Sequence, residues 1–147
     1  MKKFMATAIA ALMMMVVTAG ALAATNTNDG PSYATPFSFV AYCNDVNRIE
    51  KDPNHVGYKS NDDKKIYARH WVTGGSDSYT NLLKVYNVDD RIYYGNKWAT
   101  VGMNVPIQSN SIKINRSYVM GGRGNTNHYN YDGVVKVTLH GNFYTDL

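Results

Sequence analysis

The stretch YVMGGRGNTNHYNYDG, from Tyr118 to Gly133, gathers residue types that are common in ligand-binding loops. Its glycines lack the lysine and hydroxyl pair of a phosphate-binding loop, and the pattern predicts no following helix to bind a dinucleotide. A calcium loop is also disfavoured, because Asp132 is the one carboxylate among the candidate oxygen ligands of this stretch. The sequence therefore favours glycine-rich turns, with Asp132 and Gly133 turning the chain into its last strand.

Arg123 is the residue of this stretch that best fits a binding role. It lies between glycines and precedes Tyr129 and Tyr131. A guanidinium group beside tyrosine rings can bind an anionic or sugar-like group through forked hydrogen bonds and stacking. We therefore predict a candidate binding group of Arg123, Tyr129 and Tyr131, provided that the three side chains point outward together.

Aromatic side chains elsewhere suggest a second kind of binding surface. The chain has 12 tyrosines and two tryptophans, and flat aromatic faces of small secreted β-domains often bind glycans or proteins. Tyr67 with Trp71, and Tyr93 with Tyr94, are the pairs that would build such a face. The alternative is that these rings fill or cover the core, and the sequence leaves both interpretations open.

The histidines predict neither catalysis nor a metal site. His55, His70, His128 and His140 are scattered along the chain and show none of the spacings that bring two metal ligands together. No nucleophile motif or paired-carboxylate motif accompanies them. We expect a non-enzymatic protein without a cofactor, and we rank a hydrolase that uses His128 or His140 with Asp132 last.

Cys43 is the only cysteine, so the chain cannot form an internal disulfide. Its position at the end of the apolar run FSFVAYC favours a buried thiol that packs as a small apolar side chain. The alternative is a disulfide to a second chain, which would make a dimer. A catalytic thiol is the least favoured of the three, because no histidine lies nearby in the sequence.

The first residues have the pattern of a secretory signal peptide. Lys2 and Lys3 precede an apolar run and a small-residue pattern at 21–23, so we expect cleavage after residue 23 or 24. The run is shorter than the roughly 20 residues of a membrane-spanning helix, so no stable membrane span should remain. We predict a signal peptide at 1–23, a flexible leader at 24–36 and a folded domain at 37–147 that is secreted or held at the cell surface.

The charge of the expected mature chain gives no argument for nucleic acid as a partner. The formal net charge of +4 falls to +2 once Lys2 and Lys3 are removed, so the sequence pI of about 9.1 overstates the basic character. We expect a cell-envelope glycan or another protein as the partner instead.

The rest of the sequence is typical of β-structure, because strong helix formers are scarce while aromatic and β-branched residues are common. Alternating patterns predict strands at 37–43, 56–59, 65–72, 82–88, 105–107, 111–114, 117–120 and 134–144. We predict a single all-β domain, an antiparallel β-sandwich or flattened barrel of about seven to nine short strands.

Several finer expectations follow from the same patterns. The strands at 56–59 and 65–72 should form a hairpin, and the aliphatic side of the second strand should face the core. Proline makes 105–107 an edge strand, and a turn is expected at 52–54. The hairpin after residue 88 should turn at 89–90 or at 95–96. Separately, a short helix that begins with a serine cap is possible at 76–83.

The strand KIYARHW and the ending YVMGGRGNTNHYNYDGVVKVTLHGNFYTD resemble an uncharacterised family of small Gram-positive proteins with signal peptides, known as a domain of unknown function. The similarity covers the C-terminal two thirds of the expected mature chain, including residues 68–71 and the spacing of Val137, Gly141 and Asp146. It implies an association with bacteriocin transport genes. A second similarity, to secreted β-sandwich bacteriocins of the lactococcin type, implies an antimicrobial protein. No functional residue is carried over from either family.

Overall fold

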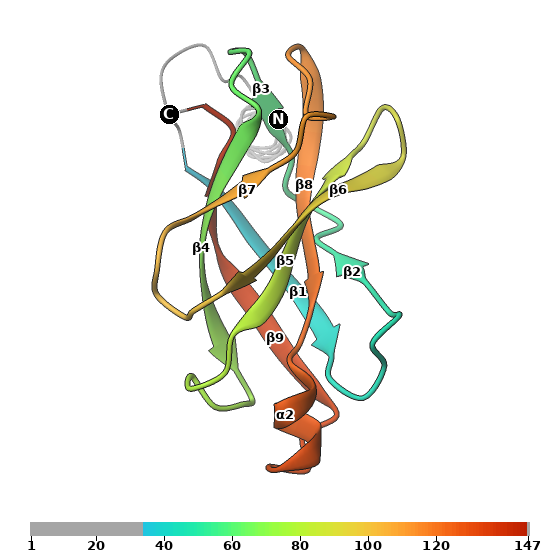
Figure 1. Cartoon of the computed structure of the whole chain (residues 1–147), viewed down its shortest axis with the longest axis vertical. Helices are drawn as coiled ribbons and strands as arrows, with labels where there is room; N and C mark the ends of the chain where they lie inside the picture. Colours follow the sequence, from blue (N-terminus) through green and yellow to red (C-terminus); the bar gives the residue numbers. More distant parts are fainter. Residues whose placement is uncertain (1–33, 147) are drawn as a thin grey trace, which may run out of the picture.

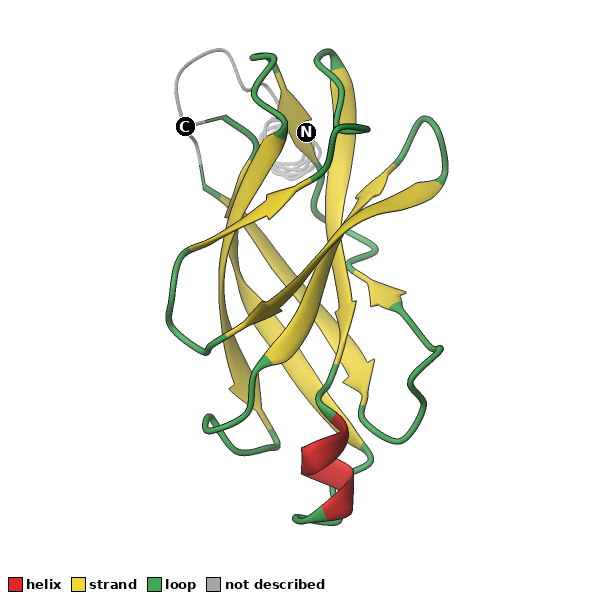
Figure 2. Cartoon of the chain, in the orientation of Figure 1, coloured by secondary structure: helices red, strands yellow, loops and turns green. Residues whose placement is uncertain are grey.

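The computed structural model describes residues 34–146, which form a layered β-structure with one short helix (Figure 1, Figure 2). The strands are β1 (Thr35–Tyr42), β2 (Glu50–Lys51), β3 (Gly57–Lys59), β4 (Lys65–Thr73), β5 (Asn81–Asn87), β6 (Ile92–Ala99), β7 (Val105–Gln108), β8 (Arg116–Arg123) and β9 (Lys136–Tyr144). The helix α2 (Thr126–Asn130) lies between β8 and β9 in sequence and at one end of the molecule. The predicted signal peptide and most of the predicted leader lie outside the described residues.

The strands form two antiparallel sheets, which confirms the predicted all-β sandwich. Sheet A has the order β1-β9-β4-β7, so the proline-containing strand β7 is an edge strand as predicted. Sheet B has the order β2-β8-β5-β6, with β3 also paired to β8. Strand β1 begins at Thr35, two residues before the predicted domain boundary. The predicted strand at 111–114 is not formed, and Ile112 is instead buried beside a turn.

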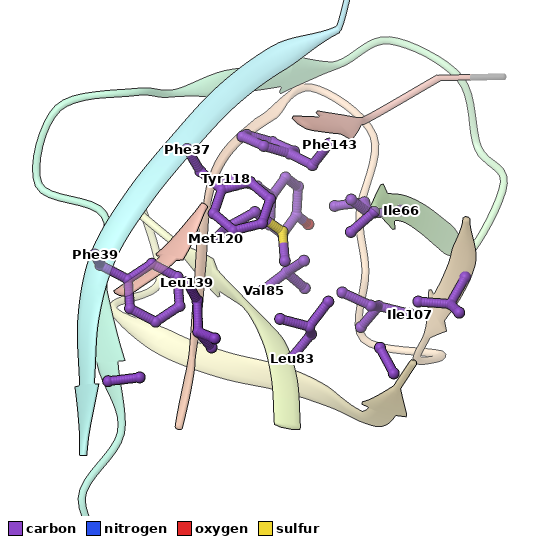
Figure 3. Packing of buried hydrophobic residues seen from close by; sticks show 14 of the residues in the cluster. Phe37, Phe39, Ile66, Leu83, Val85, Ile107, Tyr118, Met120, Leu139 and Phe143 are labelled. Atoms are coloured by element: carbon purple, nitrogen blue, oxygen red, sulfur yellow. The ribbon is translucent and has the colours of Figure 1, made fainter. Parts of the chain in front are cut away.

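The inner sides of both sheets pack into one core (Figure 3). Burial alternates along β1 and along most of β4, and on β4 the aliphatic side faces inward as predicted. Burying one large apolar side chain stabilises a fold by about 1.5 to 3 kcal/mol, so this shared core holds the two sheets together. The largest contributors include Phe37, Phe39, Ile66, Leu83, Val85, Ile107, Tyr118, Met120, Leu139 and Phe143.

Strand β6 contains a β-bulge. The register of β6 against β5 shifts between Leu83 and Val85, so that Gly95 and Asn96 lie opposite Lys84 alone. Gly95 has a φ of 66°, a left-handed conformation that glycine adopts without strain. The later of the two predicted turn positions is therefore wrong, and the chain turns before β6 begins.

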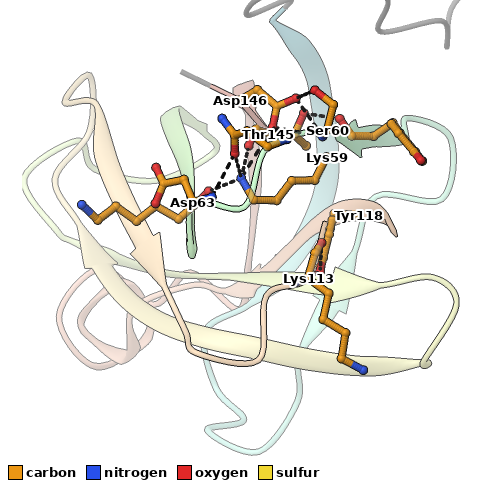
Figure 4. A network of polar contacts seen from close by, with 10 residues as sticks. Lys59, Ser60, Asp63, Lys113, Tyr118, Thr145 and Asp146 are labelled. Atoms are coloured by element: carbon orange, nitrogen blue, oxygen red, sulfur yellow. Dashed lines mark hydrogen bonds and ion pairs between the residues drawn. The ribbon is translucent and has the colours of Figure 1, made fainter. Parts of the chain in front are cut away.

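The connection from β3 to β4 crosses from sheet B to sheet A, so the hairpin predicted over 56–72 is wrong. The crossing is held by Lys59, which is fully buried and donates a hydrogen bond to the backbone oxygen of Thr145 at 2.6 Å (Figure 4). The carboxylate of Asp146 lies 3.6 Å from the same ammonium group and accepts hydrogen bonds from Ser60. Burial lowers the pKa of Lys59. These contacts join residues that are distant in sequence, so no local pattern predicts them.

The glycine-rich stretch is not a single loop. Strand β8 continues through its two adjacent glycines to Arg123, and α2 follows after Asn125, whose side chain accepts a hydrogen bond from the backbone of Asn127 at 2.9 Å. The expectation that no helix follows the glycines is therefore wrong, although α2 has only 5 residues. The alternative helix at 76–83 is also wrong, because Asn81 begins β5.

Candidate functional site

The outer side of sheet A carries aromatic rings beside hydrogen-bonding side chains. On β4 and β9 alternate residues point away from the core, and the antiparallel register sets them in pairs across the two strands. The pairs are Tyr67 with Tyr144, Arg69 with Asn142, Trp71 with His140, and Thr73 with Thr138. We call this set of residues face A.

Trp71 is the centre of face A. Its ring is stacked with the imidazole of His140, with centroids 6.4 Å apart and an angle of 24° between the planes. The guanidinium carbon of Arg69 lies 4.9 Å from the indole centroid. Thr73 Oγ1 lies 3.1 Å from His140 Nε2, a contact that orients the imidazole ring. Face A therefore combines a half-buried aromatic surface with several side chains able to donate or accept hydrogen bonds.

A groove of about 410 Å³ continues face A toward the edge strand β1. It is lined by Val40 of β1 and by Thr138 of β9, which also belongs to face A. Residues from the segment 48–53 line it from the other side, and Arg48 lies 3.5 Å from the centroid of the Tyr42 ring. The flat face and the groove thus form one continuous surface.

Asp52 fixes the segment that lines the groove. Its side chain is buried, and its Oδ2 accepts a hydrogen bond of 2.6 Å from the backbone of Ser38 in β1. Its Oδ1 accepts a hydrogen bond of 2.7 Å from the backbone of Asn54, and His55 Nδ1 lies 3.0 Å from Oδ2. The predicted turn at 52–54 is confirmed, and the same carboxylate caps a backbone N–H group on the open edge of sheet A.

The outer side of sheet B carries a different combination, in which cations lie over aromatic rings. The pairs are Lys51 over Tyr86 at 3.5 Å, Lys84 over Tyr93 at 5.8 Å and Arg123 over Trp98 at 4.9 Å. We call this set of residues face B. Two of its rings, Tyr86 and Tyr93, meet edge to face with centroids 4.9 Å apart.

The structure separates the residues of the predicted arginine and tyrosine group. Arg123 ends β8 on face B, whereas Tyr129 lies in α2 and Tyr131 follows it. Both tyrosines are exposed, at 46% and 77%, but within residues 34–146 no ring or cation contact joins either one to Arg123. Trp98 was missed as the partner of Arg123, because β5 lies between their strands and only the sheet order brings them together.

Tyr93 and Tyr94 do not form the common platform that the sequence suggested. Tyr93 lies on face B, where its ring meets Tyr86. Tyr94 packs against the core, and its hydroxyl donates a hydrogen bond of 3.1 Å to Asp90. Adjacent residues of a strand point to opposite sides of the sheet, so one ring of this pair is structural.

His128 and His140 show no hydrogen bond to Asp132 in the described part of the chain. His128 is fully buried, burial lowers its pKa, and its ring nitrogens have no hydrogen-bond partner among residues 34–146. Asp132 accepts a hydrogen bond of 3.4 Å from Tyr79, and His140 lies against Trp71. In the same residues, no three His, Cys, Asp or Glu side chains are grouped so that they could hold a metal ion.

His70 lies directly behind face A, on the inner side of β4. It is fully buried, and its Nε2 lies 3.3 Å from the side-chain nitrogen of Asn81. Burial, with a smaller contribution from His140, lowers the pKa of His70 to about 4. The imidazole is therefore neutral at pH 7, so His70 adds no charge beneath face A.

Cys43 is fully buried, as predicted. Its backbone donates a hydrogen bond of 2.9 Å to Val135, and its sulfur packs against Gly124. Burial raises the pKa of the thiol, although the nearby charge of Arg123 acts in the opposite direction. The alternative of a disulfide to a second chain would require the end of β1 to open.

Comparison with protein-family models, with curated proteins and with solved structures finds no significant match. Among residues 34–146, no helix has the length and apolar character needed to cross a lipid bilayer. Function is therefore inferred below from the side chains of the two outer faces.

Proposed function

We propose that this protein is a secreted, non-enzymatic β-sandwich that binds a cell-envelope glycan through face A and the adjoining groove. The observation that carries the proposal is Trp71, a half-buried indole on a flat sheet with His140, Arg69 and Thr73 around it. A sugar ring has an apolar side that packs on an aromatic ring, and hydroxyl groups that need polar partners at its edge. An association with bacteriocin production is part of this proposal.

The side chains of face A favour a ligand rich in hydroxyl groups over a highly charged one. Asn142 and Thr138 offer neutral donors and acceptors, His140 adds an imidazole, and Arg69 adds a planar group with several N–H donors. The groove volume lies within the range of about 300 to 1,000 Å³ that is usual for small-molecule sites. A short oligosaccharide could therefore extend from Trp71 into the groove.

The two tryptophans provide a matched test, because Trp71 lies on face A and Trp98 on face B. Purified protein should sediment with bacterial peptidoglycan, and Trp71→Ala should weaken this binding at least tenfold, as expected for a central aromatic contact. Trp98→Ala, which removes a more exposed ring from the other sheet, should bind almost normally. Equal binding by wild type and Trp71→Ala would contradict the proposal.

A growth-inhibition assay with the same proteins distinguishes binding from killing. Inhibition of Gram-positive bacteria by the wild type would instead support the antimicrobial activity that the lactococcin resemblance implies. Absence of inhibition, together with Trp71-dependent sedimentation, would support a binding protein.

A further inference from the structure

We propose that face B is a second binding site, and that its ligand is a linear polyanion with repeating phosphate or sulfate groups. The proposal starts from its three cations, Lys51, Lys84 and Arg123, which lie over rings rather than beside carboxylates. The ion pairs found among residues 34–146 involve other cations. A ring contact leaves the charge and most N–H donors of a cation in place. Burial, with a smaller contribution from the nearby Glu50 carboxylate, raises the pKa of Tyr93, but Glu50 pairs with Arg48, so the three cations leave face B positively charged.

The register of sheet B sets these cations around a shallow floor. Gly121 of β8 lies between Lys51 of β2 and Lys84 of β5, and it has no side chain to separate them. Because neighbouring strands are about 4.8 Å apart, the two lysine backbones are roughly 10 Å apart. Arg123 follows two residues along β8, roughly 7 Å farther on. A ligand that extends along β8 can therefore contact all three cations.

The rings of face B complete this floor. A Cβ at Gly121 would lie 2.7 Å from the ring of Tyr93, so the tyrosine leans over the glycine and closes the gap between the strands. Tyr86 and Tyr93 are inclined at 63°, an edge-to-face arrangement that offers no flat surface for successive bases. The positive charge of face B favours a polyanion, and the angle between the two rings favours one without bases over single-stranded nucleic acid.

The two faces lie on opposite sides of the sandwich, because each is the outer side of a different sheet. A hydroxyl-rich glycan on face A and a polyanion on face B could be bound at the same time. One domain would then connect two different polymers of a cell envelope.

The test measures binding of long-chain inorganic polyphosphate, dextran sulfate and uncharged dextran to the purified protein at low salt. We expect the two charged polymers to bind, and Lys51→Gln/Lys84→Gln to weaken the binding at least tenfold. The matched control is Lys64→Gln/Lys65→Gln, which removes the same charge from the start of β4 in sheet A, away from face B, and should change the affinity less than twofold. A preference between phosphate and sulfate would identify the anionic group.

Lys51 also lines the groove, so a second variant separates the two sites. Lys84→Gln/Arg123→Gln leaves the groove intact and should lose polyphosphate binding while still sedimenting with peptidoglycan. The inference is overturned if neither charged polymer binds, or if the control variant loses as much affinity as Lys51→Gln/Lys84→Gln. Tighter binding of a single-stranded oligonucleotide of equal charge would also overturn it, by assigning face B to nucleic acid.

Discussion

Face A and face B are built on equivalent outer surfaces, yet they offer opposite chemistry. Each has one tryptophan and two tyrosines, and each places a guanidinium group 4.9 Å from the indole centroid. On face A the remaining positions carry amide, hydroxyl and imidazole groups, whereas on face B they carry lysines. In a sandwich the aromatic surface can therefore be similar on both sheets, while the side chains between the rings determine which class of ligand is bound.

The two residues of β2 show this division most directly. Glu50 pairs with Arg48 and neutralises the cation that lines the groove beside face A. The next residue, Lys51, lies over Tyr86 and contributes an unpaired charge to face B. Exposed ion pairs contribute little to stability, so the Glu50 carboxylate acts mainly on local charge, in the groove and at the nearby ring of Tyr93.

Lowering the pH should produce the largest difference between the two sheets, a difference in their stability. The folded pKa of His70, about 4, lies below the ordinary histidine value of 6.5, so the unfolded chain binds more protons between these values. Stability should therefore fall as the pH is lowered from about 6.5 to about 4, by about 3 kcal/mol for His70. The lowered pKa of His128 acts in the same direction.

The measurement is hydrogen exchange at pH 7 and pH 4, with urea unfolding at each pH. Protection factors, which correct for the slower intrinsic exchange at pH 4, should fall first in β4 and β9 of sheet A, which adjoin His70. His140→Gln is the control, because this half-buried histidine contributes less than burial to the lowered pKa of His70, so the variant should keep most of the acid sensitivity. An earlier loss of protection in β5 and β8 would contradict the expected order.

Raising the salt concentration should produce the next largest difference, a difference in ligand affinity between face A and face B. Three cations on a linear polyanion predict that polyphosphate binding to face B falls roughly twentyfold to fortyfold between 50 and 200 mM salt. Binding of an uncharged glycan to face A should change less than twofold over the same range. Titrations of both ligands in one salt series check this, and parallel salt dependence would mean that the two faces are not chemically distinct.

Thr73→Val should produce the smallest effect, confined to face A. It removes the hydroxyl that contacts His140 but keeps the β-branched shape that suits a strand. Loss of one such hydrogen bond should weaken glycan binding about threefold to tenfold without affecting polyphosphate binding. Thr100→Val is the control at an exposed position outside both faces. Equal affinities of the two variants would show that the hydroxyl does not position His140 for the ligand.

The features of the fold that depend on adjacent residues were predictable from the sequence. The alternation of side chains predicted the buried sides of β1, β4 and β9, because a period of two is a local property of any strand. The same pattern correctly placed Tyr67 and Trp71 on one surface. It could not predict that His140 lies beside Trp71, since that contact depends on the pairing of β4 with β9.

The features that depend on sheet order were not predictable. The expected hairpin from β3 to β4 looked sound locally, but Lys59 is held by residues 145 and 146 and β3 joins the other sheet. Arg123 was expected beside Tyr129 and Tyr131, but it lies over Trp98, because the tyrosines that are near it in sequence are not its neighbours in space. Face B was missed for the same reason, as its residues come from four strands.

The bulge in β6 determines which rings reach face B. Tyr93 and Trp98 are five positions apart, an odd number, so a regular strand would turn them to opposite sides of the sheet. The bulge at Gly95 adds one residue to β6 and so shifts the alternation of side chains by one position. Both rings therefore point outward, while Ala99 is buried. Deleting Gly95 would turn Tyr93 inward and so remove its ring from face B, although the sequence would still contain every residue of that face. The aromatic surface is thus encoded by the length of a strand as well as by its residues.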